Sequence, residues 1–313
     1  MTTDGSSSSF FSLGATLLKR AMVTVGWGIN NGSSGIDPLP PWCIGAAAGC
    51  IGYFTLYGAS RVYCRSKALA PLWITESYAA LKNDAARADW DARVPSTIHS
   101  LFCVLGMYYP SFLLAASGSD GRVNFYDDRM YVEYGITGIG PEFFCGMFVS
   151  YLLSDLSGIA YHAIFKREQV PNFVPIVAHH TLAAIAWSSI LATRRFQWYG
   201  CFWMIAELST LFVNIRMWLY ECNLKHTKFY FYNGCVMTLS FFLVRVATLP
   251  FTTYIFFTSD RQALADQDAP QATLMTGCVI FNGLLQSYWF TLMVKGALKA
   301  MRNGRKDESK KKR

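Results

Sequence analysis

The sequence predicts an all-α integral membrane protein with about seven transmembrane helices, on three observations. Hydrophobic residues make up 52% of the 313-residue chain and charged residues only 15%, whereas a soluble domain carries about 25% charged residues. Apolar runs near the ~20 residues that cross a ~30 Å hydrocarbon core recur along the chain. Lysine and arginine gather in the short segments on one side of these runs, as they do in cytosolic loops of membrane proteins.

The N-terminal segment, residues 1–40, is expected to lie outside the bilayer core. Residues 1–9 are polar and rich in serine, which indicates disorder. Residues 10–29 are moderately apolar but contain Lys19 and Arg20, and no basic region precedes them. This pattern favours an interfacial helix over a signal peptide.

The first span, 42–64, carries Gly45, Gly49 and Gly52, whose small size allows a neighbouring helix to approach closely. Pro71–Arg93 is expected to form a surface helix, so that residues 41–93 make one unit. The remaining spans are predicted at 94–116, 141–165, 173–193, 197–220, 229–258 and 273–299, within a core of residues 94–300. An acidic loop, Gly118–Gly140, interrupts this core, and residues 301–313 form a basic tail.

The positions of lysine and arginine predict a luminal N-terminus and a cytosolic C-terminus. The cytosolic segments would then hold Arg65, Lys67, Lys82, Arg87, Arg93, Lys166, Arg167, Lys225, Lys228 and the tail from Lys299 on. The opposite side would hold Lys19, Arg20, Arg122, Arg129, Arg194, Arg195 and Arg261. The Arg194-Arg195 pair runs against this assignment.

Polar side chains lie inside several of the apolar runs, where burial is costly unless they pair or serve a function. His179 and His180 are adjacent in the fourth span, roughly 10 Å deep at 1.5 Å per residue, and Glu207 is at mid-depth in the fifth. The other spans place polar residues at similar depths: His99, Asp155, His162, Asn214, Arg216 and Arg245. Any one of these alone is better explained by a structural polar network. The histidine pair with Glu207 favours a functional site, because adjacent imidazoles point about 100° apart and rarely meet one packing need.

The nine cysteines contain no CxxC motif, and most lie in apolar runs, which indicates buried free thiols rather than disulfides or a zinc site. The net charge of +8 is concentrated at the C-terminus. We therefore expect no nucleic-acid partner, and an acidic lipid surface or a sorting receptor instead.

Three separated motifs resemble the TLC domain family (TRAM, LAG1 and CLN8 homology). They are the VAHHTLAAIAW run at His179-His180, the AELSTLFVNIRMW segment and the later FFLVRVATLP segment. The resemblance covers roughly residues 90–300. It implies a multi-pass protein of the endoplasmic reticulum or related membranes, with six helices forming a barrel around a central cavity. The second to seventh spans would form that barrel, and the first would be extra.

Ceramide synthases belong to the same superfamily, and their fingerprint is a His-His pair followed by two aspartates three residues apart. His179 and His180 match the pair. Glu207 stands where the first aspartate is expected, and Thr210 stands where the second is. The missing carboxylate weighs against ceramide synthesis but leaves another acyl transfer open.

The first functional hypothesis is acyl-lipid chemistry, in membrane lipid metabolism or lipid homeostasis. One of His179 and His180 would act as general base or as acyl-accepting nucleophile, and Glu207 or Asp155 would orient the ring. Arg216 and Arg245 would hold anionic head or phosphate groups, and the further substrate-binding candidates are His99, His162 and Asn214. No cofactor or metal is predicted, and acyl-CoA would enter as a substrate.

The second hypothesis is a non-catalytic protein: a lipid-binding regulator of membrane composition or a cargo receptor. The absence of a second aspartate favours it. A metal enzyme of the desaturase type is disfavoured, because the five histidines form no HxxxH or HxxHH box. A transporter is disfavoured, because no pair of Gly/Pro-broken helices repeats across two halves.

The chain ends in Lys310-Lys311-Lys312-Arg313. Lys310 and Lys311 resemble a dilysine retrieval signal, which coat machinery reads on a cytosolic tail; such signals are addresses rather than anchors. The alternative is a basic tail that rests on anionic lipid, at roughly 1 kcal/mol per basic residue near the surface.

Overall fold

The computed structural model describes residues 40–105, 141–170, 172–193 and 196–311, which form helices joined by short turns and loops, with no strand among them. The α-helices are α2 (Pro41–Arg65), α3 (Leu72–Ala79), α4 (Asp84–Phe102), α5 (Pro141–Ala160), α6 (Phe173–Thr193), α7 (Gln197–Trp203), α8 (Leu208–Glu221), α9 (Lys228–Phe241), α10 (Leu249–Ile255), α11 (Arg261–Gln267) and α12 (Ala269–Lys311). The 3-10 turns are η3 (Met204–Glu207) and η4 (Leu224–His226), and the π-helical turns are η2 (Tyr161–Phe165), η5 (Phe242–Val246) and η6 (Phe256–Asp260).

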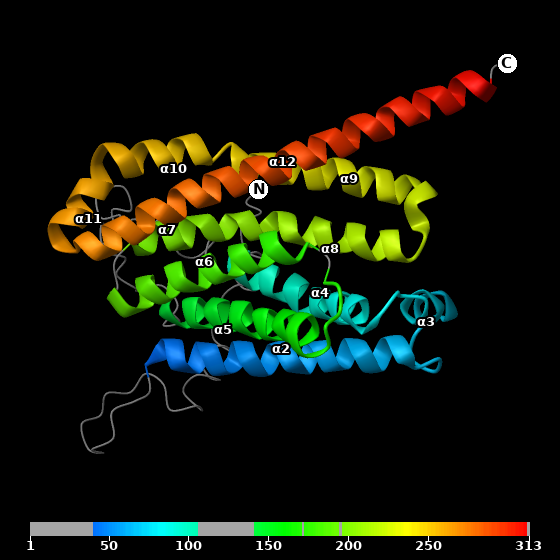
Figure 1. Cartoon of the computed structure of the whole chain (residues 1–313), viewed down its shortest axis with the longest axis horizontal. Coiled ribbons are helices and arrows are strands. Elements are labelled where there is room, and N and C mark those ends of the chain that lie inside the picture. The colour runs from blue at the N-terminus through cyan, green and yellow to red at the C-terminus, as the bar shows by residue number, and fades with distance from the viewer. Residues whose placement is uncertain (1–39, 106–140, 171, 194–195, 312–313) are drawn as a thin grey trace, which may run out of the picture.

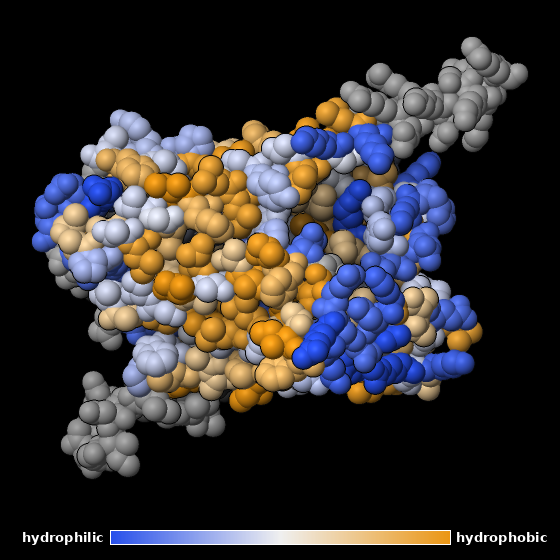
Figure 2. Space-filling model, viewed as in Figure 1, coloured by the Kyte–Doolittle hydropathy of each residue, from blue (hydrophilic) through white to orange (hydrophobic). Residues whose placement is uncertain are grey.

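Most of the long helices run side by side along the long axis of the molecule (Figure 1). Among the described residues, five helical segments are long and apolar enough to cross a membrane: Pro41–Arg65, Glu142–Phe165, Phe173–Thr193, Lys228–Thr258 and Ala269–Lys299. Figure 2 shows hydrophobic residues over the middle of the visible face and hydrophilic residues toward both ends. This banding suits a membrane protein, because apolar side chains must meet the acyl chains and polar ones the two aqueous layers.

Two further predicted spans differ from these five. The run 197–220 is divided by the 3-10 turn Met204–Glu207 into α7 and α8. The run 94–116 is described only to residue 105, and it continues a helix that begins ten residues earlier, at Asp84. The predicted surface helix Pro71–Arg93 is therefore wrong as a single element. It is α3 followed by the first half of α4, because Asn83 caps α4 by accepting a hydrogen bond from the Ala86 N–H at 2.9 Å.

Several sequence predictions lie outside the described residues. They are the N-terminal disorder and interfacial helix, the acidic loop 118–140, and the side assigned to Arg122, Arg129, Arg194 and Arg195. Helix α12 continues past the predicted span, leaves the bundle and includes the backbone of Lys310 and Lys311.

Helix α2 packs along α5 through glycines. A Cβ atom at Gly45 would meet the Phe143 carbonyl, and one at Gly146 would meet the Trp42 carbonyl. Gly49 lies equally close to the side chain of Ser150. The prediction of a close helix approach is confirmed at Gly45 and Gly49 but is wrong at Gly52, where a Cβ would have no neighbour within 4 Å.

The remaining helices contact one another in sequence around the interior. Helix α4 packs against α5 and α8, α5 against α6, α6 against α12, α12 against α9, and α9 against α8. The π turns η2 and η5 lie in this set and carry His162 and Arg245. Such turns insert an extra residue per turn, which reorients side chains and is frequent at functional sites.

Candidate functional site

A cavity of about 430 Å³ lies inside the bundle, between α2, α4, α5, α6, α8 and α12. Seven of the nine predicted site residues line it: Asp155, His162, His179, His180, Glu207, Asn214 and Arg245. Polar groups from segments up to 90 residues apart in the chain therefore share one hollow. This is the arrangement that lowers the cost of burying them, because they can pair there.

His180 and Asp155 form the first pair. Nδ1 of His180 lies 3.2 Å from Oδ2 of Asp155, although the ring is turned so that Nδ1 makes no well-aligned hydrogen bond. The other carboxylate oxygen accepts a hydrogen bond from the Tyr53 hydroxyl at 3.0 Å. Tyr53 comes from α2, so the extra first helix reaches into the cavity and fixes the acid beside the imidazole.

His179 is the least constrained of the ionisable groups. Its ring lies edge-on to Trp289, with centroids 5.2 Å apart, and 5.6 Å from the His180 ring. No hydrogen bond joins it to any group that the structure describes. His179 also lines the central cavity, so its ring borders the space open to a bound molecule.

Glu207 and Arg245 form a buried ion pair, with Nη2 to Oε1 at 3.3 Å. Thr210 completes the arrangement: its hydroxyl donates to Glu207 at 2.9 Å and accepts from Arg245 at 3.1 Å. Arg245 also donates to the Ala206 carbonyl and to Gln286 of α12. Its N–H groups are thus directed at protein acceptors, so this guanidinium ties η3 and α8 to η5 and α12 and is poorly placed to hold an anionic headgroup.

Asn214 joins α8 to α4. Its amide donates to the hydroxyls of Ser96 and Thr97 at 3.1 and 3.0 Å, and its oxygen accepts from Arg93 at 3.2 Å. Arg93 pairs in turn with Asp89 at 2.7 Å. Arg93 and Asp89 both line the cavity, and the sequence analysis had assigned them to a surface helix.

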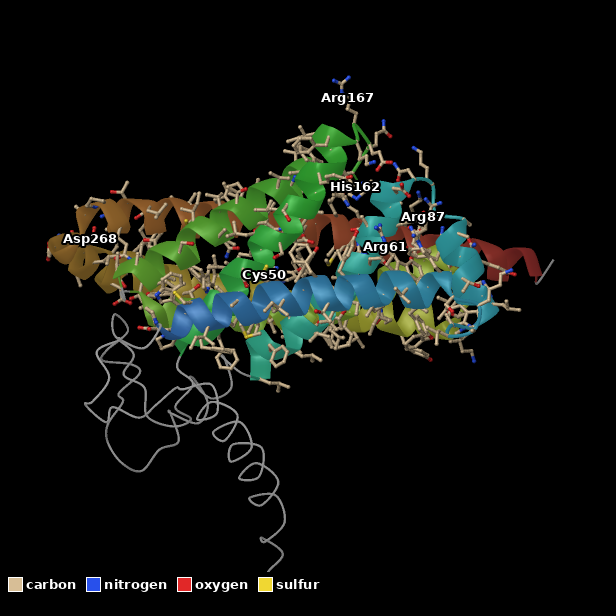
Figure 3. The ribbon with its side chains drawn as sticks, turned by 90° about the horizontal axis from the view of Figure 1, so that it is seen from below. Cys50, Arg61, Arg87, His162, Arg167 and Asp268 are labelled. Carbon is tan, nitrogen blue, oxygen red and sulfur yellow. The ribbon has the colours of Figure 1, made fainter. Side chains whose placement is uncertain are left out.

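His162 lies toward the end of the cavity where α4 begins. Nδ1 of His162 is 2.9 Å from Oε2 of Glu168, and Val170 and Asn172 continue the lining. In Figure 3, His162 lies at the same end of the bundle as Arg61 and Arg87, with Asp268 at the opposite end and Arg167 projecting outward. The polar part of the cavity therefore reaches the end predicted to be cytosolic.

Two predicted site residues are not brought to the cavity. His99 is buried one layer behind it, where its ring stacks on Tyr151 with centroids 3.9 Å apart and Nε2 lies 3.3 Å from the Cys103 sulfur. Arg216 lies over the Tyr230 ring, with 4.0 Å from Cζ to the centroid, and donates to the Tyr230 carbonyl at 3.1 Å. It therefore joins α8 to α9.

A smaller pocket of about 70 Å³ shares a wall with the central cavity, formed by Phe148, His179, Glu207 and Arg245. Beyond this wall its lining is largely apolar and includes Leu182, Ala186, Trp187, Trp203 and Leu249. The polar part of the central cavity and the apolar recess therefore meet at His179. The recess is well below the ~300 Å³ at which ligand sites begin, so it suits only a small apolar group.

Sequence reasoning missed four residues that shape the site: Tyr53, Arg93, Tyr151 and Trp289. Tyrosine and tryptophan are common throughout this chain, and nothing in spacing marks these three aromatics. Arg93 carries a usable signal, because Asp89 precedes it by four residues on the same helix face. That pair indicates a helix that begins before residue 94.

Comparisons with known proteins agree with the helical bundle. The TLC domain family model matches residues 89–295. TLC domain-containing protein 4-B of Danio rerio is 29% identical over 71% of this chain and 80% of its own, and human TLC domain-containing protein 4 is 27% identical over 72% and 80%. Topoisomerase I damage affected protein 4 of Saccharomyces cerevisiae is 31% identical over 35% of this chain and 42% of its own.

Proposed function

Because this chain belongs to the TLC domain family, we propose that it acts on membrane lipids by acyl transfer in the central cavity. The observation that carries the proposal is the unpartnered ring of His179, which lies between a polar cavity and an apolar recess and beside the His180–Asp155 pair. A reactive carbonyl at this position would have a nucleophile or base within reach, and its chain would lie in the central cavity of about 430 Å³.

The proposal includes the architecture. Seven segments would cross the membrane. Six of them would form a barrel, with α2 packed outside it. The six are α4, α5, α6, α7 with α8, α9 with α10, and α12. The successive contacts from α4 through α5, α6, α12, α9 and α8 back to α4 support it. The break at Met204–Glu207 falls where Glu207 enters the cavity, and irregular backbone at membrane depth is tolerated where it lines a polar cavity.

In the first step, a ring nitrogen of His179 attacks the carbonyl carbon of acyl-CoA. The carbon–sulfur bond breaks, and coenzyme A leaves as the thiolate. In the second step, a lipid amine or hydroxyl attacks the acyl-imidazole, the carbon–nitrogen bond breaks, and His180 accepts the proton of the acceptor group. Asp155 holds His180 and stabilises its protonated form.

A second candidate function is lipid binding or cargo sorting without turnover. The observation in its favour is that most charged groups of the cavity are already paired with one another, as Arg245 with Glu207, Arg93 with Asp89 and His162 with Glu168. Thr210 also occupies the position of a second carboxylate and acts as a hydroxyl bridge. The two functions differ in whether a bound acyl group is transferred.

The test uses purified full-length protein in lipid nanodiscs with long-chain acyl-CoA and lipid acceptors, and it measures free coenzyme A together with the lipid products. Acyl transfer predicts coenzyme A release by wild-type protein, a loss of about 10²-fold or more in His179→Ala, and no change in His226→Ala. His226 is the matched control, because it is exposed in η4. Stoichiometric lipid that survives long incubation unchanged, with equal background in all three proteins, would establish the second function.

We further propose that the protein resides in the endoplasmic reticulum with its C-terminus in the cytosol. Two features support this orientation. First, one end of the bundle holds the end of α2, α3, the start of α4 and η4, and α12 also runs toward it (Figure 1). Second, these are the segments whose lysines and arginines predicted a cytosolic location. Lys310 and Lys311 would then face the coat machinery.

A further inference from the structure

A second cavity, of about 480 Å³, lies between the C-terminal ends of α2 and α8, with α3 and α4 beside it. We call it the α2–α8 pocket. Its lining is almost wholly apolar and includes Leu56, Trp73, Trp90, Trp218 and Leu219. It shares no lining residue with the central cavity, and its volume lies in the range of ligand-binding sites, about 300–1,000 Å³.

The pocket is backed by a buried polar cluster around Asp91. The Tyr78 hydroxyl donates to this carboxylate at 2.7 Å, the Ser60 hydroxyl at 2.9 Å, and Nε of Arg61 at 3.2 Å. Burial, together with the neighbouring carboxylate, raises the pKa of Tyr78 to about 12, so the phenol stays protonated and remains a donor. Helices α2, α3 and α4 are thereby fixed relative to one another, and the pocket is preformed.

The mouth of the pocket has the character of a membrane interface. Cys64 and Trp90 are 4% and 6% exposed, whereas Tyr63 and Trp73 are 41% and 52% exposed. Tyrosine and tryptophan are enriched where acyl chains give way to headgroups. The lining therefore runs from a dry interior to an aromatic rim at the level where a phospholipid has its ester groups.

One polar atom among the residues that line the pocket lacks a hydrogen-bond partner in the described part of the chain. The indole Nε1 of Trp218 is buried and has no hydrogen-bond partner among the residues that the structure describes. A buried indole N–H normally finds an acceptor. Nε1 has almost no exposed surface, so the indole would have to turn before a bound ester carbonyl could accept from it.

The rim is basic. Arg65 follows the lining residue Cys64, and Lys225 follows the lining residue Leu224; both are exposed, and the ammonium of Lys225 lies 3.6 Å from the centre of the Tyr220 ring. Exposed Lys67 and Lys228 lie two and three residues farther along, with Glu76 and Glu221 the acidic residues of the same segments. The excess of positive charge complements an anionic headgroup.

We propose that the α2–α8 pocket binds one acyl chain of an anionic glycerophospholipid, with its headgroup against Arg65 and Lys225. The lipid is a bound, unreacted component of the protein, since no histidine lines this pocket and its two thiols, Cys64 and Cys222, have no basic side chain among the lining residues. The inference goes beyond acyl transfer and does not depend on it.

The test uses tryptophan fluorescence of the full-length protein in detergent micelles, titrated with dibrominated phosphatidylserine or dibrominated phosphatidylcholine. Bromine on the acyl chain quenches nearby indoles, and three tryptophans line the pocket. Ala59→Phe fills the pocket from the exposed face of α2, and Ala48→Phe is the matched control on the same helix outside it. Arg65→Glu with Lys225→Glu reverses the rim charge.

The proposal predicts saturable quenching by phosphatidylserine that is retained in Ala48→Phe and lost in Ala59→Phe. The charge-reversed variant should bind about 25-fold or more weakly, since the loss of two basic contacts at roughly fivefold each multiplies. Equal quenching by the two lipids, or equal quenching of wild type and Ala59→Phe, would overturn it. So would an intact mass showing an acyl group bonded to Cys222. Coenzyme A release should be unchanged in Ala59→Phe, so this result and that of the acyl-transfer test are read separately.

Discussion

Nδ1 of His180 lies 3.2 Å from Oδ2 of Asp155, and the Tyr53 hydroxyl holds the other oxygen of that carboxylate at 3.0 Å. Residues from α6, α5 and α2 thus meet at one point of the cavity wall. The acid lies beside the imidazole of His180 and would stabilise the imidazolium formed during transfer. Both the proposed mechanism and the first prediction depend on this contact between His180 and Asp155.

Replacing Asp155 with asparagine should lower kcat for acyl transfer by about 10²-fold with a smaller change in KM, because the loss falls on the charged state of His180 rather than on binding. The measurement is steady-state coenzyme A release. Tyr53→Phe, which keeps the carboxylate but removes one of its donors, should lie between Asp155→Asn and wild type. A rate for Asp155→Asn equal to that of wild type would remove Asp155 from the mechanism.

Replacing Arg245 with methionine should destabilise the folded protein by about 3–5 kcal/mol, because Glu207 would remain buried without its partner. Thermal unfolding in a fixed detergent measures the change. Arg216→Met is the control, since Arg216 packs on the Tyr230 ring outside the cavity, and its effect should be smaller. The double variant Glu207→Gln, Arg245→Met should recover part of the loss; no recovery would mean that the ion pair is not the cause.

Replacing Gly45 with leucine should destabilise the α2–α5 interface by about 1–3 kcal/mol, because the new side chain meets the Phe143 carbonyl. Gly52→Leu is the matched control on the same helix, with no atom within 4 Å of the added Cβ. Detergent-induced unfolding of the two variants checks this. Equal stability of the Gly45→Leu and Gly52→Leu variants would contradict this, because it would mean that α2 and α5 move apart at little cost in free energy.

Replacing Lys310 and Lys311 with serine should move the protein out of the endoplasmic reticulum if the tail carries a retrieval signal. Immunofluorescence against compartment markers is the measurement, and Arg302→Ser with Lys306→Ser is a control for loss of basic charge elsewhere in the tail. An unchanged distribution of the Lys310/Lys311 variant would contradict the retrieval role and favour electrostatic contact with lipid.

Depth and helical spacing predicted most of the site. Counting residues from the ends of the spans placed His179, His180 and Glu207 at similar depths, and the structure brings all three to one cavity. The same counting explains Arg216: nine residues after Glu207 on a helix corresponds to about 180° of rotation, which turns it away from the cavity and toward α9. Asn214, seven residues after Glu207, stays on the cavity side.

The parts that sequence reasoning missed depend on tertiary contacts. The sequence predicts 197–220 as one span, and only the structure shows the 3-10 turn at Met204–Glu207 that divides it. Gly45 and Gly52 share a helix face, yet only at Gly45 would an added Cβ meet an atom of α5 within 4 Å. Tyr53 carries no signal of its own, since its role comes from the position of Asp155 on another helix.

The most direct measurement is a structure of the full-length protein with an acyl-CoA analogue in which a methylene group replaces the thioester sulfur, so that no transfer occurs. The account predicts the ketone carbon within about 3.5 Å of a ring nitrogen of His179, the distance of a near-attack geometry, with the hydrocarbon chain along the apolar lining of the central cavity at Trp289, Leu292 and Met293. An analogue bound elsewhere with the central cavity empty, or a His179 ring walled off from the ketone by packed aromatic side chains, would contradict it.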